Sequence, residues 1–165
     1  MRVWDPVVRS IHWTVAALVA VDLLNEAGAN PWHRYIGYAA VALVASRLAW
    51  GMLDTGHARL SRMAKKALSA HRSFTGVPDV AHTPLGALMA FALWSLVLLA
   101  GVTGWMLGLD AFWGEQWLQD LHAALSYALA GCMVVHVAAA IVTSRLQRVN
   151  LVKAMVTGEK AIPQP

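Results

Sequence analysis

Residues 121–140 read LHAALSYALAGCMVVHVAAA, an uninterrupted apolar segment with a histidine near each end. The segment contains no charged residue, and a helix of about 20 apolar residues is long enough to cross a lipid bilayer. It belongs to one of four such stretches, which lie at about 6–27, 31–53, 84–109 and 117–145. The sequence therefore predicts an all-α membrane protein, a bundle of four transmembrane helices.

The composition agrees with this fold class and limits the chemistry. Among the 165 residues, 58% are hydrophobic and 13% are charged, whereas soluble domains average about 25% charged residues. A chain of this length forms one domain, predicted here over residues 1–165. The single cysteine, Cys132, excludes an internal disulfide and a CxxC metal site, and the absence of CxxCH argues against covalently attached heme.

Positive charge is concentrated on one side of the predicted membrane. Twelve of the 13 Lys and Arg residues lie on one predicted side of the membrane, together with the N-terminus, the loop at 54–83 and the tail at 146–165. Arg34 alone lies on the other side. Because segments rich in Lys and Arg stay in the cytoplasm, both termini, the loop and the tail are predicted to be cytoplasmic. The basic loop fits an anchor on the lipid surface better than a nucleic-acid site, so no nucleic-acid partner is expected.

Four histidines lie within the predicted spans and pair by depth. His122 and His136 are 14 residues apart, which is about four turns and roughly 21 Å along one helix face. His12 lies at the cytoplasmic end of the first span, at the depth of His136. His33 lies at the outer end of the second span, at the depth of His122. We call His12 and His136 the inner pair, and His33 and His122 the outer pair.

Two facing imidazoles at one depth indicate a heme iron with both axial positions filled, which suits electron transfer because no position is left for oxygen. A zinc site would need three or four ligands in one cluster. A hydrogen-bonded core histidine is the ordinary explanation for a single buried histidine, but four in matched pairs would each carry the cost of a buried polar group. We therefore predict two hemes b. The residues expected to fill the space between them are Leu125, Leu129 and Met133.

Three further residues are candidates for contact with these hemes. Gly37 lies on the helix face of His33 and leaves room for a flat macrocycle. Arg47, 14 residues after His33, reaches the depth of the inner pair, and Arg9 lies one turn before His12. A guanidinium at either position can pair with a heme propionate. The alternative for both arginines is a side chain that extends to the membrane surface.

The third span contains no histidine. Its TGWMLG segment places Gly104 and Gly108 in a GxxxG arrangement, a close-packing motif of membrane helices. This span is therefore expected to be a structural partner of the other three. His82 precedes it, and is either an interfacial or capping histidine or a contact for a quinone or a propionate.

Seven segments carry a family resemblance: VWDPVVRSIHW, HRYIGY, SRLAWG, HTPLGALM, VTGWM, the segment at 121–140, and LVKAMVTGEK. In these segments the chain resembles the bacterial cytochrome b561 family, which includes the cytochrome b subunits of nickel-iron hydrogenases. The resemblance implies a four-helix cytochrome of the bacterial inner membrane with two b hemes, ligated from the first, second and fourth helices. It also implies electron transfer between a periplasmic redox protein and the quinone pool. The four histidines match the ligand positions of the family.

One branch of this family is similar to superoxide oxidase, which passes an electron from superoxide to ubiquinone. Against the single Arg34, the predicted outer side carries five acidic residues and a net charge of −4: Asp22, Glu26, Asp110, Glu115 and Asp120. Because this field repels an anion such as superoxide, a basic periplasmic protein such as a c-type cytochrome is the preferred partner. The sequence leaves open whether the chain is an electron-transfer protein or a quinone-linked oxidoreductase, and it is compatible with a homo-oligomer.

A third class of function is a heme-free membrane protein whose histidines carry protons. Asp22, an ionisable residue within a span, keeps this class open. The ordinary explanation for Asp22 is an interfacial carboxylate paired with Arg34. A visible spectrum of the purified protein separates this class from the other two.

Overall fold

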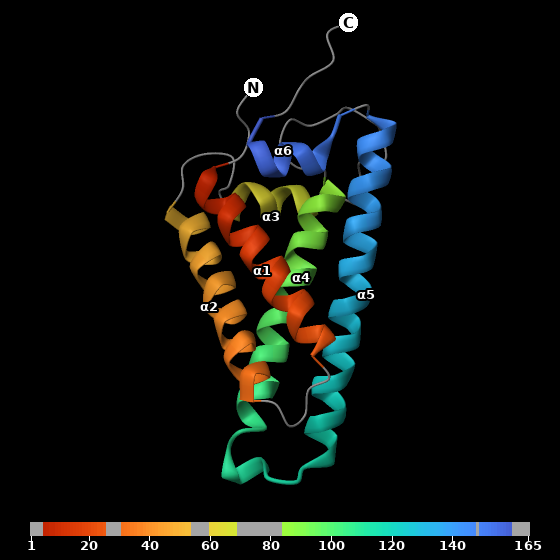
Figure 1. Ribbon diagram of the computed structural model, residues 1–165. Helices are drawn as coiled ribbons and strands as arrows, with labels where there is room; N and C mark the ends of the chain where they lie inside the picture. Colours follow the sequence, from red (N-terminus) through yellow and green to blue (C-terminus); the bar gives the residue numbers. More distant parts are fainter. Residues whose placement is uncertain (1–4, 26–30, 54–59, 69–83, 148, 160–165) are drawn as a thin grey trace, which may run out of the picture.

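The structure is a computed structural model that describes residues 5–25, 31–53, 60–68, 84–147 and 149–159. Four helices in these residues are long and apolar enough to cross a membrane. They are α1 (Pro6–Leu24), α2 (Pro31–Leu53), α4 (Pro84–Met106) and α5 (Gln116–Leu146). The predicted fold class, an all-α bundle of four transmembrane helices, is confirmed (Figure 1).

Local sequence signals set the ends of the long helices. Asp5 caps α1, since its Oδ1 accepts a hydrogen bond of 2.7 Å from the Val7 N–H, and Pro6 occupies the first position, which needs no N–H. The first and third helices end three residues earlier than predicted, at Leu24 and Met106. After α4 the sequence stays apolar while the backbone bends into a turn. Hydropathy cannot predict this bend, so it places the helix end too late.

The long helices pack in a particular order. Helix α1 packs against α2, α2 against α4, and α4 against α5 (Figure 1). Among the described residues, few close backbone contacts join α5 to α1 or to α2. Side chains that connect α5 to α1 or α2 therefore bridge a larger distance between helix backbones than side chains at the α1–α2, α2–α4 and α4–α5 interfaces.

An apolar layer lies at the middle of the bundle. Its buried residues come from all four long helices: Val19, Ala40, Val44, Val97 and Leu129. Three of them, Val19, Ala40 and Leu129, lie seven residues after a histidine of the two pairs on the same helix, which is about 10 Å along the axis. Met133 packs against this layer. The layer therefore separates the two ends of the bundle, with Leu129 in it and Met133 against it.

The segments predicted as a loop and a tail both contain a helix. The loop at 54–83 includes α3 (Leu60–Leu68), which packs against α4 and buries Met63 to 2% exposure. The tail includes α6 (Leu151–Thr157), which is capped by Asn150 at its start and by Gly158, where φ is 82°, at its end. Hydropathy misses both helices because 9 and 7 residues are too few to span a bilayer.

Both short helices lie at the end of the bundle where α1 begins (Figure 1). Trp13 Nε1 donates a hydrogen bond of 3.4 Å to the carbonyl oxygen of Met155, which connects α1 to α6. At the opposite end, α4 is joined to α5 through the 3-10 helix η2 (Asp110–Phe112). The position of α3 and α6 at one end of the bundle agrees with a loop and a tail on the same side of the membrane. The assignment of that side to the cytoplasm stays a prediction.

Candidate functional site

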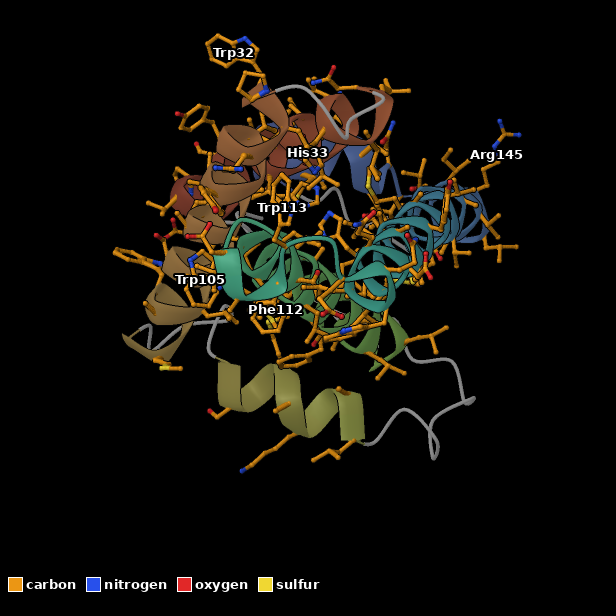
Figure 2. The ribbon with its side chains drawn as sticks, turned by 90° about the horizontal axis from the view of Figure 1, so that it is seen from below. Trp32, His33, Trp105, Phe112, Trp113 and Arg145 are labelled. Carbon is orange, nitrogen blue, oxygen red and sulfur yellow. The ribbon has the colours of Figure 1, made fainter. Side chains whose placement is uncertain are left out.

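The outer pair joins α2 to α5 near the end of the bundle that carries η2. The rings of His33 and His122 lie close together and nearly perpendicular, with centroids 6.0 Å apart and ring planes at 86°. Figure 2 looks along the bundle from this end and shows His33 directed toward the interior and Trp32 directed away from it. The structure thus brings together two histidines that are 89 residues apart in the sequence.

The inner pair joins α1 to α5 on the other side of the apolar layer. The rings of His12 and His136 have centroids 6.2 Å apart and ring planes at 60°. Trp13 packs edge-on against His12, with the two centroids 5.4 Å apart. Both histidine pairs expected from depth are therefore close in space.

The spacing of both pairs fits two ligands on opposite sides of one metal ion. A metal ion holds an imidazole nitrogen about 2 Å away, which places the centroids of two opposed rings about 6 Å apart. Two imidazoles joined by a direct hydrogen bond of about 2.9 Å would have centroids about 5 Å apart. The observed separations of 6.0 and 6.2 Å agree with the first arrangement. The two histidines of each pair therefore fit as ligands that would hold one heme iron.

A carboxyl group on α1 orients His33. Asp22 Oδ1 lies 2.9 Å from His33 Nδ1. A carboxylate only accepts hydrogen bonds, so Nδ1 of a neutral His33 carries the hydrogen and Nε2 keeps its lone pair. Carboxylate–histidine–metal arrangements of this kind fix the orientation of metal ligands. In the described part of the chain the Asp22 carboxyl group contacts His33 and forms no ion pair with Arg34, so the pair with Arg34 that the sequence suggested is wrong.

A hydroxyl group on α4 orients His122. Thr103 Oγ1 lies 2.9 Å from His122 Nδ1, and 3.0 Å from the carbonyl oxygens of both Leu99 and Ala100. The single O–H of Thr103 donates to one of these carbonyls, so its oxygen accepts from the Nδ1–H of His122. Nε2 of His122 therefore keeps its lone pair, as in His33.

Helix α4 does more than the structural role predicted for it. Thr103, which was not among the predicted site residues, is 6% exposed and contacts a histidine of the outer pair. An added Cβ at Gly104 would lie 3.1 Å from His122 Cε1, so a glycine here lets the ring approach the helix backbone. In the sequence, a threonine next to a glycine at the depth of the outer pair is the feature that could have indicated this contact.

Two arginines lie toward the opposite end of the bundle. Arg47 is 5% exposed, with its guanidinium carbon 5.4 Å from the Trp94 ring centroid and its Nη2 4.0 Å from Met63 Sδ. Arg9 is partly buried, and its Nε is a buried donor without a hydrogen-bond partner among the described residues. Arg47 is therefore covered by neighbouring helices, and Arg9 keeps a buried donor available to an anionic group.

Gly37 and His82 complete the predicted site residues. An added Cβ at Gly37 would lie 3.8 Å from Asp22 Oδ2, so Gly37 lies beside the Asp22–His33 hydrogen bond. Room for a macrocycle at Gly37 stays a prediction. His82 lies outside the described residues.

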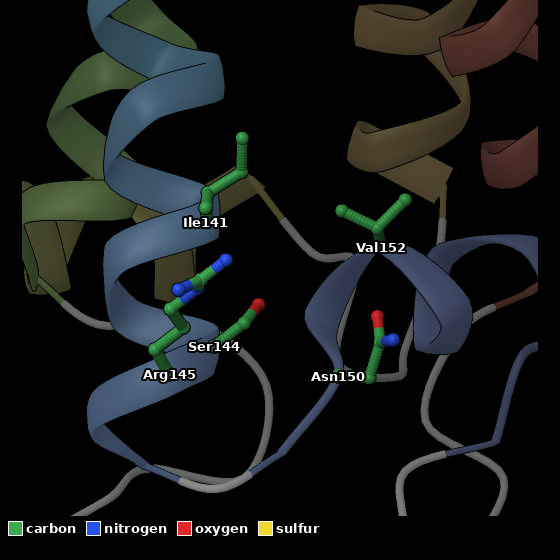
Figure 3. A pocket seen from close by; sticks show the side chains of 5 residues that line it. All are labelled: Ile141, Ser144, Arg145, Asn150 and Val152. Carbon is green, nitrogen blue, oxygen red and sulfur yellow. The ribbon is translucent and has the colours of Figure 1, made fainter.

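A pocket of about 440 Å³ lies between α5 and α6 (Figure 3). It is lined by Ile141, Ser144, Arg145, Asn150 and Val152. Two of its polar groups are used within the protein: Ser144 Oγ donates to the Ala140 carbonyl and accepts from the Leu151 N–H, and Asn150 caps α6. None of the predicted site residues lines this pocket, so it is separate from both histidine pairs.

Four membrane-spanning helices with two opposed pairs of imidazoles are typical of membrane cytochromes b. A family model described as prokaryotic cytochrome b561 matches residues 3–158, and the chain belongs to this family. It is accordingly a multi-pass, heme b electron-transfer protein of a membrane. No curated protein and no solved structure matches the chain.

Proposed function

We propose that the protein passes electrons across the bacterial inner membrane through two hemes b, between a periplasmic redox protein and the quinone pool. The observation that carries this proposal is the opposed pair of imidazoles on each side of the apolar layer, with centroids 6.0 and 6.2 Å apart. In the proposal, His12 and His136 hold the inner heme, and His33 and His122 hold the outer heme. Both termini lie in the cytoplasm, on the basic side of the membrane.

The residues around the outer pair prepare it to bind iron. A heme b held by His33 and His122 would supply one-electron redox chemistry, and with two histidine ligands it would not bind oxygen. Asp22 and Thr103 hold the Nδ1–H groups of His33 and His122, so each Nε2 lone pair is available to the metal. The apolar layer keeps water out of the space between the two pairs.

Arg47 is proposed to neutralise a propionate of the inner heme, with Arg9 as the second candidate. Loss of a buried cation favours the oxidised, more positive iron. Arg47→Gln should therefore lower the midpoint potential of the inner heme by roughly 60 mV, which corresponds to about 1.4 kcal/mol, and leave the outer heme nearly unchanged. Redox titration measures both midpoints, and Arg145→Gln, which removes an exposed cation, is the matched control. Two unshifted midpoints in Arg47→Gln would leave Arg47 only a packing role beneath α3.

The charge at the outer end favours a basic redox partner. Asp110, Glu115 and Asp120 are exposed at this end of the bundle. Asp22, which the count from the sequence included, is bonded to His33 and does not belong to this surface. Glu26 lies outside the described residues. We call Asp110, Glu115 and Asp120 the acidic rim.

A basic c-type cytochrome should exchange electrons with the reconstituted protein at a rate that falls about tenfold or more as salt rises well past 0.1 M, where the Debye length is about 10 Å. Neutralising the acidic rim with Asp110→Asn, Glu115→Gln and Asp120→Asn should flatten this dependence. Glu159→Gln, at the other end of the chain, should not. Stopped-flow mixing across a salt series measures the rates.

Superoxide oxidation is the competing activity, and the same experiment includes superoxide as a second reductant. If the cytochrome rate is flat with salt while superoxide reduces the outer heme near the diffusion limit, the acidic rim is not a docking surface and superoxide oxidase becomes the preferred function. The heme-free, proton-carrying alternative predicts a purified protein without a heme spectrum in the visible range.

A further inference from the structure

We infer that Asp22 lowers the reduction potential of the outer heme, so that electrons pass from the outer heme to the inner one. The inference rests on the proposed function, because it takes His33 as a ligand of the outer heme. Asp22 is then a positioning residue that acts on the iron through His33.

Asp22 differs from the other acidic residue of the spans. Only Asp22 and Asp120 are acidic in the four described membrane-spanning helices. Asp120 is exposed and accepts a hydrogen bond of 2.9 Å from Gln116. The Asp22 side chain is 17% exposed, and its Oδ1 is 2.9 Å from His33 Nδ1. Because an acidic residue inside a membrane is costly to bury, a role at His33 explains why one is present there.

The backbone of α2 accommodates this carboxyl group. Its second oxygen, Oδ2, would lie 3.8 Å from a Cβ added at Gly37, one turn along α2 from His33. Asp22 is therefore held between the imidazole of His33 and the surface of α2 at Gly37. A fixed position keeps the carboxyl group on the ligand instead of at the membrane surface.

The surroundings of the two pairs differ in the sign of their buried charge. In the described part of the chain, Asp22 and His33 are the only carboxyl group and histidine whose side chains are in direct contact. Toward the end with the inner pair, the buried charged group is the cationic Arg47, and the partly buried Arg9 lies one turn before His12. The outer pair thus has a negative neighbour, and the inner pair lies in the part of the bundle with the cations.

This difference in charge gives the outer heme a lower reduction potential than the inner heme. A carboxylate that accepts the Nδ1–H of a ligating imidazole makes that imidazole a more basic ligand. A more basic ligand and a nearby negative charge both stabilise the oxidised iron, which lowers the potential, whereas buried cations raise it. With both hemes bound, the outer heme would be the stronger reductant, so transfer of one electron from its ferrous form to the ferric form of the inner heme would be favourable. The periplasmic partner is accordingly the electron donor, and the quinone is the acceptor.

The test is a redox titration of the purified, heme-loaded protein and its variants, followed by visible absorption. The outer heme is assigned as the component lost in His33→Ala. Asp22→Asn keeps the size of the side chain and removes its charge. It should shift the ferric–ferrous equilibrium of the outer heme about tenfold toward the ferrous form, an upward shift of about 59 mV, and leave the inner heme unmoved. Thr103→Val, which removes only a neutral acceptor, should shift the outer heme in the same direction by less.

Glu115→Gln is the matched control, because it removes one exposed negative charge at the same end of the bundle without a contact to His33. The inference is overturned if Asp22→Asn binds two hemes and leaves the outer potential unchanged, or if Glu115→Gln shifts it equally. It is also overturned if the outer heme of the unmodified protein has the higher potential. Should Asp22→Asn fail to fold, Asp22→Ser, which is smaller and neutral, must give the same upward shift. A heme content near zero in the unmodified protein would instead overturn the proposed function.

Discussion

His136→Ala and His12→Ala should each remove the inner heme and leave the outer one, so that the heme content falls from two to one per chain. His122→Ala and His33→Ala should each remove the outer heme. The physical reason is that, in the proposed function, one imidazole from α5 and one from α1 or α2 would hold each heme, so loss of either histidine would remove half of the ligand pair. Pyridine hemochrome quantitation together with a redox titration measures which component each variant has lost.

The control for these variants is His57→Ala, which removes a histidine outside the four spans and should retain both hemes. The central comparison is which of the four histidine variants lose the same heme. If His136→Ala and His33→Ala lose the same heme, or if the single variants retain both hemes, the assignment of ligands by depth is wrong.

Gly101→Leu should destabilise the bundle by about 1–3 kcal/mol, the usual cost of forcing extra atoms into a packed interior. Helix α4 lies so close to α2 at Gly101 that an added Cβ would overlap Cγ2 of Val41. Val41 is β-branched and has little rotamer freedom in a helix, so the backbones must separate. Thermal unfolding in detergent, followed by circular dichroism, measures the loss.

Gly131→Leu is the matched control, because a Cβ added at Gly131 meets no atom within 4 Å. This variant should unfold at or above the temperature of the unmodified protein, since leucine has the higher helix propensity. A double variant, Gly101→Leu with Val41→Ala, should recover part of the stability, as expected for residues in direct contact. Equal stability of the two leucine variants would show that α2 and α4 are not in close contact at this position.

Helical periodicity accounts for the part of the site that could be predicted from the sequence. A spacing of 14 residues repeats one helix face four turns later, so His122 and His136 define two depths on α5. The chain direction of each span then matches His12 and His33 to those depths. The same geometry places Leu129, seven residues from each histidine of α5, in the middle layer.

The contacts of the outer pair could not be predicted in this way, because they depend on which faces of different helices meet. Periodicity along α4 predicts which face of the helix carries Thr103, but it does not predict which helix packs against that face. The packing of α4 against α5 brings Thr103 to His122. The sequence suggested Arg34 as the partner of Asp22, but the arrangement of α1 against α2 brings the neighbouring His33 to it. The short helices α3 and α6 could not be predicted from hydropathy for a different reason, because helices of 9 and 7 residues are too short to cross a bilayer.

The heme content of the purified, unmodified protein tests the central claim most directly. The claim is that each opposed pair of imidazoles, with centroids 6.0 and 6.2 Å apart, holds one heme b. Pyridine hemochrome quantitation against protein concentration from amino-acid analysis should give two hemes b per chain. A ratio near zero, or a ratio near one with all four histidines intact, would contradict it.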